Sequence, residues 1–149
     1  MALTRSALRS ALAVAAAAGA LVLTACAPLP TGAADSFPGW PPVEMPGEGG
    51  SGTMADGSFH ALWVEEGQKL AVVTEGSSSC PLVGDRIEVV QPEGEGNAVR
   101  IVLKDIPADK ACTRDMAPYT TEFWTPEAVT TTEPLTVQIG DQAIIVPVK

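Results

Sequence analysis

Short runs of β-branched and aromatic residues, separated by Gly, Pro, Asn and Asp, fill the chain from residue 58 to residue 149. This pattern is typical of strands joined by turns, and no stretch in it has the length expected of a helix. About seven such runs in about 90 residues predict an all-β domain, a small antiparallel β-sandwich or barrel. The expected strands are residues 59–65, 69–75, 86–90, 98–104, 119–124, 135–139 and 142–148.

Three pairs of neighbouring runs predict hairpins. The first turns at residues 66–68, the second at residues 91–97, and the third at Gly140-Asp141, where glycine can supply the positive φ of a type II′ turn. Trp63 and Trp124 fall within strand patterns and are expected to be core or half-buried residues. The alternative for these two is an exposed platform that stacks on carbohydrate or peptide.

The first 25 residues have the three zones of an export signal: Arg5 and Arg9, an uncharged run over residues 11–23, and small residues before Cys26. The run is too short and too rich in Ala for a membrane-spanning helix, which needs about 20 apolar residues. An ordinary secretory signal, cleaved near Cys26 without lipidation, is the alternative interpretation.

Leu23-Thr24-Ala25-Cys26 resembles the lipobox of bacterial lipoproteins, in which an aliphatic residue and two small residues precede an obligatory cysteine. The resemblance implies that the Cys26 thiol carries diacylglycerol and that Cys26 becomes the first residue of the mature chain. It also implies anchorage at the outer face of the cell membrane. Two acyl chains, at about 0.8 kcal/mol per buried methylene, would make that anchor effectively permanent.

Loss of the signal removes Arg5 and Arg9 and leaves 7 basic against 18 acidic residues, a formal charge of −11. This charge argues against a nucleic-acid partner, which would need a basic patch. Residues 26–57 then form a predicted tether, because 13 of the residues from 27 to 57 are Pro or Gly and none is basic. Phe37 and Trp40 are unusual in a spacer and could instead dock on the domain or on a partner.

Cys80 and Cys112 remain once Cys26 is lipidated, and both lie in polar loops of an exported chain. They predict a disulfide, which would stabilise the fold by about 3 to 4 kcal/mol. A zinc site would need more ligands, and His60 is the single histidine. We therefore expect no metal and no cofactor.

Catalytic groups are sparse. Ser77, Ser78 and Ser79 lack the nucleophile-elbow motif, and His60 is the one candidate base for a small serine hydrolase. The carboxylates at residues 65–66, 93 and 95 are expected to be solvated turn charges, and residues 91–97 only faintly resemble a calcium loop. The sequence favours a domain that is not an enzyme.

The segments "GSSSCP" and "CTRDMAP", with the terminal β run, resemble a group of small actinobacterial envelope proteins. The resemblance covers most of residues 58–149 and implies a shared small fold without an activity. We expect a binding or structural domain that meets an unknown envelope protein or small ligand. An accessory subunit of a transporter or envelope enzyme is the second hypothesis. The candidate partner surface comprises Ser77, Ser78, Ser79, Arg114, Asp115 and Met116, on the two loops that the disulfide would join.

Overall fold

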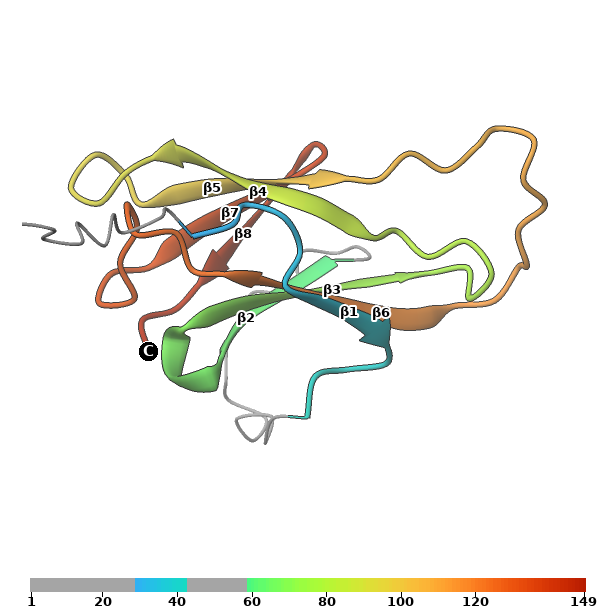
Figure 1. Cartoon of the computed structure of the whole chain (residues 1–149), viewed down its shortest axis with the longest axis horizontal. Coiled ribbons are helices and arrows are strands. Elements are labelled where there is room, and N and C mark those ends of the chain that lie inside the picture. The colour runs from blue at the N-terminus through green and yellow to red at the C-terminus, as the bar shows by residue number, and fades with distance from the viewer. Residues whose placement is uncertain (1–28, 43–58) are drawn as a thin grey trace, which may run out of the picture.

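The computed structural model describes residues 29–42 and 59–149 (Figure 1). Within these residues the chain forms eight strands and one short 3-10 turn, so the predicted all-β class is confirmed. The elements are β1 (Asp35–Pro38), β2 (Phe59–Val64), η1 (Glu65–Gly67), β3 (Lys69–Gly76), β4 (Gly84–Gln91), β5 (Ala98–Leu103), β6 (Ala117–Trp124), β7 (Leu135–Ile139) and β8 (Gln142–Val146). Each of the expected strands is present, with small differences at the ends.

Two four-stranded sheets lie face to face, with strand orders β1-β6-β3-β2 and β4-β5-β7-β8 (Figure 1). The three predicted hairpins are confirmed as the antiparallel pairs β2–β3, β4–β5 and β7–β8. Gly140 takes a φ of +56°, as the predicted turn requires.

One pairing corrects the expectation of a purely antiparallel sandwich, because β5 and β7 run parallel. The chain leaves β5, returns along the other sheet as β6, and enters β7 at the end where β5 began. A parallel pair needs such a crossover connection between its strands, and here β6 supplies it.

The core lies between the two sheets and is made of alternating inward-facing side chains. Leu70, Val72 and Phe123 from one sheet meet aliphatic residues of the other, among them Val99 and Val137, and all five are fully buried. The period-2 alternation of a strand places these residues on one face, so the sequence pattern accounts directly for the core.

Trp63 and Trp124 are half-buried, in agreement with the sequence-based expectation. Trp63 packs against the core, and its indole N–H donates to the carbonyl of Pro147 at 3.0 Å. Trp124 lies on the outer face, where the Lys69 ammonium sits 5.0 Å from its ring centroid. This geometry is that of a cation–π contact.

The ring of Phe123 in β6 lies tightly against the backbone at the start of β4. A Cβ at Gly84 would lie 2.5 Å from a ring carbon of Phe123, so no larger residue fits without displacing that ring. The Gly84 N–H donates to the Thr121 hydroxyl at 3.0 Å. A glycine at this position therefore lets the backbone of one sheet bond a side chain of the other.

Asn97 is a buried polar residue that organises the loop between β6 and β7. Its amide N–H₂ donates to the carbonyls of Thr130, Glu133 and Pro134 at 3.0, 3.3 and 3.1 Å, and its carbonyl accepts from the Thr130 N–H at 3.0 Å. Its φ of +46° is one that asparagine tolerates better than most residues. One side chain thus bonds four backbone groups of this loop.

Residues 31–39 correct the prediction that the chain from 26 to 57 is a tether and that the domain begins at residue 58. Asp35–Pro38 forms β1, an edge strand antiparallel to β6. Phe37 is half-buried in this strand, and the Trp40 ring lies 4.9 Å from the His60 ring, so both aromatics dock on the domain. The high Pro and Gly content of residues 27–57 predicted a tether, but within that segment residues 31–39 have enough apolar side chains to pack on the domain.

The same stretch also contacts the other sheet. The Ile87 N–H donates to the Thr31 carbonyl at 2.8 Å, and the Ala33 N–H donates to the Asp85 carbonyl at 3.2 Å. The chain then crosses to β6, where the Gly39 N–H donates to the Pro118 carbonyl at 2.9 Å. We call residues 31–39 the N-terminal strap, because they pair with an edge of each sheet (blue to teal in Figure 1).

Residues 1–28 and 43–58 lie outside the described residues. The predicted signal peptide, Cys26 and the remainder of the predicted tether fall within them.

Removal of the strap is expected to destabilise the domain. A chain that begins at residue 43 should lose about 2 to 3 kcal/mol of unfolding free energy relative to one that begins at residue 29, because Phe37 no longer buries its ring. Urea unfolding followed by tryptophan fluorescence measures the difference. Equal midpoints for the two chains would show that the strap adds nothing to the fold.

Candidate functional site

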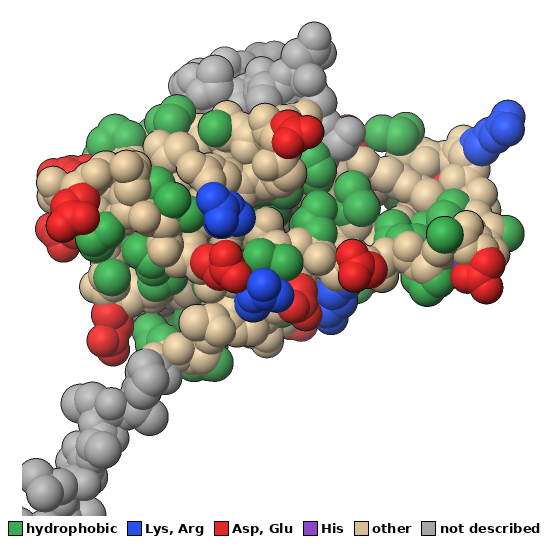
Figure 2. Space-filling view, turned by 90° about the horizontal axis from the view of Figure 1, so that it is seen from above, with side chains coloured by type: hydrophobic (Ala, Val, Ile, Leu, Met, Phe, Trp, Pro, Cys, Tyr) green, Lys and Arg blue, Asp and Glu red, His purple; other side chains and the backbone are tan. Residues whose placement is uncertain are grey.

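The predicted disulfide between Cys80 and Cys112 is confirmed, with Cα atoms 5.5 Å apart and a sequence separation of 32. It joins residues 77–83, which connect β3 to β4, with residues 104–116, which connect β5 to β6. Both connections project beyond the sandwich at the end away from the C-terminus (Figure 1). In Figure 2 this projection is narrow and carries acidic, basic and apolar side chains.

Hydroxyl groups from the two connections meet beside the disulfide. The Ser77 and Thr113 hydroxyls share a hydrogen bond of 2.9 Å, and the Ser79 hydroxyl accepts from the Thr113 N–H at 3.0 Å. Short polar side chains can form hydrogen bonds to nearby backbone groups that have no partner in a helix or sheet. Such residues therefore favour turns and loops. The two loops are therefore held together by hydrogen bonds as well as by a covalent link.

Asp115 completes this network. Its carboxylate accepts from the Ser78 N–H at 3.1 Å and from the Thr113 hydroxyl. Hydrogen bonds from Ser78 and from Thr113 favour the charged form and lower the pKa of Asp115 to about 2. We call Ser77–Ser79 together with Thr113–Met116 the disulfide-loop surface.

The structure places all the residues of the predicted partner surface on these two loops. Ser77, Ser78, Ser79 and Asp115 lie in the hydrogen-bonded network, whereas the Met116 side chain is 69% exposed. Arg114 is also exposed, and among the described residues its side chain forms no hydrogen bond or ion pair. Ser78, Ser79 and Asp115 are solvent-exposed as well, so this surface combines polar groups that bond one another with the exposed Arg114 and Met116.

The serine hydrolase hypothesis would need His60 close to one of the three serines. His60 instead contacts the Trp40 ring, and its Nε2 lies 4.0 Å from a Glu75 carboxylate oxygen. It pairs with Val73 in β3, and Ser77 lies four residues further along, about 13 Å away at 3.3 Å per residue. No described hydrogen bond joins His60 to these serines.

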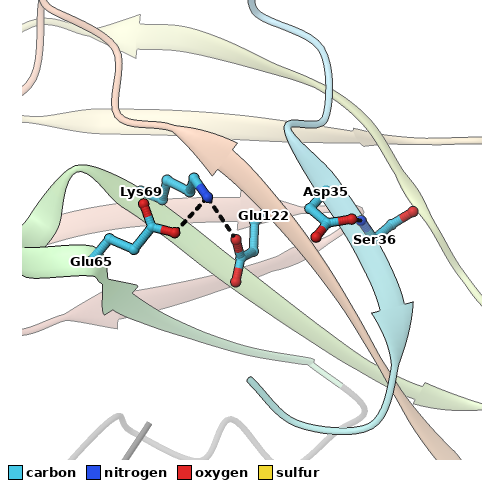
Figure 3. A network of polar contacts seen from close by, with 5 residues as sticks. All are labelled: Asp35, Ser36, Glu65, Lys69 and Glu122. Carbon is cyan, nitrogen blue, oxygen red and sulfur yellow. Dashed lines mark hydrogen bonds and ion pairs between the residues drawn. The ribbon is translucent and has the colours of Figure 1, made fainter. Parts of the chain in front are cut away.

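The carboxylates at residues 65 and 66 are solvent-exposed, as expected, at 51% and 91%, and each also forms an ion pair. The Lys69 ammonium lies 2.6 Å from Glu65 and 3.2 Å from Glu122, as Figure 3 shows. Hydrogen bonding to Glu65, with a further contribution from Glu122, raises the pKa of Lys69. Glu66 pairs with the Lys149 ammonium near the C-terminus.

This ion-pair network covers part of the outer face of the first sheet. The Lys69 and Glu122 side chains are only 13% and 10% exposed, so each charge needs its partner. Asp35 pairs with Glu122 in the strand register, and its carboxylate accepts from the Ser36 N–H at 2.7 Å (Figure 3). The Lys69 ion pairs thus link η1, β3 and β6, whereas the strap is held to β6 by strand pairing.

Glu93 and Glu95 are exposed in the β4–β5 loop, as expected. In the part of the chain that the structure describes, no cluster of three or more His, Cys, Asp or Glu side chains could hold a metal ion. The same residues contain no helix that is both long and apolar enough to cross a membrane.

No protein-family model, curated protein or solved structure matches this chain.

The hydrogen bonds to Asp115 should be visible in its titration. A pKa lowered to about 2 from an ordinary value of 3.8 means that the carboxylate strengthens the loop network above about pH 4 and loses this effect as the pH falls toward 2. The NMR shift of the Ser78 amide should therefore titrate with a midpoint near pH 2. The Thr113→Val variant, which lacks one donor, should raise that midpoint. A wild-type midpoint near pH 4 would contradict the network, and circular dichroism confirms folding at each pH.

Proposed function

We propose that the protein is a lipoprotein anchored at the outer face of the bacterial cell membrane, whose β domain binds an envelope partner without catalysing a reaction. The lipobox at residues 23–26 and the export signal before it support the anchor. The disulfide supports export, because such bonds persist in oxidising compartments.

The observation that carries the binding proposal is the disulfide-loop surface. A covalent bond and a hydrogen-bonded network fix two loops that project beyond the sandwich, while Met116 and Arg114 remain exposed on them. Loops held on a rigid β scaffold are common sites of binding residues. Little conformational entropy is lost when a partner meets loops that are already ordered.

The chemistry of the surface suits a small mixed interface. Met116 offers an adaptable apolar side chain, and the Arg114 guanidinium offers several donors to a carboxylate or carbonyl on a partner. Arginine is among the residues that contribute most at protein interfaces. A protein partner in the envelope fits this surface better than a substrate, since Asp115, the carboxylate that accepts from the Thr113 hydroxyl, has its pKa lowered to about 2 and is a poor general base.

Lipidation of Cys26 is expected to govern where the protein resides. The wild-type chain should partition into the membrane fraction, and mass spectrometry of its mature N-terminus should find diacylglycerol on Cys26. The Cys26→Ser variant should remain uncleaved or be released, because serine cannot form the thioether. A mature N-terminus at Ala27 or beyond, without an acylated cysteine, would show that the lipoprotein proposal is wrong.

Substitutions on the disulfide-loop surface are expected to weaken partner capture without unfolding the domain. Arg114→Ala and Met116→Ala should each reduce the yield of a specific crosslinked partner, while the melting temperature changes by no more than about 2 °C, as surface substitutions do. Ile145→Ala, which truncates an exposed apolar residue on β8, is the matched control. Equal yields from all three variants would place the binding surface elsewhere.

A further inference from the structure

The N-terminal strap determines how far the domain can lie from an anchor at Cys26. Thr31 is fixed to β4 through the hydrogen bond from Ile87, and it is only five residues after Cys26. Five residues span at most about 18 Å when fully extended. A free tether of residues 27–57 would instead have a root-mean-square span of about 30 Å. The described strap therefore rules out a long spacer between the anchor and the domain.

The direction of the strap selects which end of the domain is near the anchor. The strap runs antiparallel to β4, because Ala33 bonds at Asp85 and Thr31 bonds at Ile87. From Thr31 back to Leu29 the chain thus runs toward the end of β4, where Val89 and Val90 lie. Figure 1 shows this start of the strap near the β4–β5 loop.

Three exposed apolar side chains occupy this end. Leu29, Val89 and Val90 are 42%, 39% and 38% exposed. Among the described residues, the other large apolar side chains that are exposed lie outside β4 and the start of the strap; they are Trp40, Met116, Ile145 and Val148. Leu29, Val89 and Val90 thus lie at the end from which the chain leads to Cys26.

The disulfide-loop surface lies at the opposite end of the same strand. β4 begins at Gly84, directly after the loop that contains Cys80, and ends at Gln91. Its eight residues span about 26 Å at 3.3 Å per residue. The two ends are also separated along the longest axis in Figure 1.

We propose that the lipid bilayer contacts the end of the sandwich with Leu29, Val89 and Val90, and that the disulfide-loop surface points away from the membrane. The inference rests on the proposed lipidation of Cys26. The short link and the direction of the strap bring this end to the lipid headgroups. The same orientation leaves Arg114 and Met116 free to meet a partner across the envelope.

The acyl chains are needed for this contact. Glu93 and Glu95 are exposed in the loop that follows β4, and the mature chain has a strongly acidic balance, so anionic lipids repel the domain. Leu29, Val89 and Val90 are each only partly exposed, so the apolar area that they offer is small. They orient a domain that is already anchored and do not recruit it by themselves.

Site-specific quenching tests the orientation. The acylated full-length protein, with Val90→Cys or Ala108→Cys labelled by a fluorophore under non-reducing conditions, is placed in phosphatidylcholine vesicles that contain a lipid with a spin-labelled headgroup. Residue 108 is exposed in the β5–β6 connection at the disulfide end. The label at residue 90 should be quenched several-fold more than the label at residue 108. Peptide mapping confirms that the native disulfide is intact.

A spacer provides the matched control. Twenty Gly-Ser residues inserted between Pro28 and Leu29 add a coil of about 25 Å, and quenching at residue 90 should then fall toward the value at residue 108. Equal quenching at both positions in the acylated protein without the spacer would overturn the orientation alone. Absence of acyl mass on Cys26 in the same samples would overturn the lipoprotein proposal and the orientation with it.

Discussion

The apolar layer between the two four-stranded sheets is the interaction on which the rest of the structure depends. A domain of about 90 residues buries only a little over 60% of its unfolded surface, so this layer leaves a small margin of stability. Contacts at the edges and ends of the sandwich therefore add directly to the stability of the domain. The N-terminal strap pairs with both sheets on one side, and Trp63 bonds the C-terminal segment through the carbonyl of Pro147.

The small margin of stability also explains how the end of the sandwich with the disulfide-loop surface is built. Residues 77–83 and 104–116 lie beyond the apolar layer, so burial between the sheets cannot order them. The disulfide and the network around Asp115 do so instead, through a covalent link and through hydrogen bonds to Ser78 and Thr113. Order in these loops comes from local chemistry, which leaves Met116 and Arg114 available on the outside.

Local sequence patterns predicted the strands, the hairpins and the disulfide, because alternation, turn residues and cysteine context act over short distances. They did not predict β1, since the Pro and Gly content of its neighbours outweighed Phe37 and Trp40. The parallel pairing of β5 with β7 depends on the path of β6 through the other sheet. The bonds of Asn97 and the pairing of Lys69 with Glu122 join residues far apart in sequence, and no local pattern indicates them.

Hydrogen exchange in a variant without the disulfide tests most directly whether this bond holds the candidate binding surface in place. With both Cys80 and Cys112 replaced by serine, no free thiol remains, and the unfolding free energy should fall by about 3 to 4 kcal/mol. The amide of Ser78, which donates to Asp115, should lose its protection, while the amides of β3 and β6 remain protected under conditions where the domain is folded. Unchanged protection at Ser78 would contradict the account, because the loops would then be ordered without the disulfide.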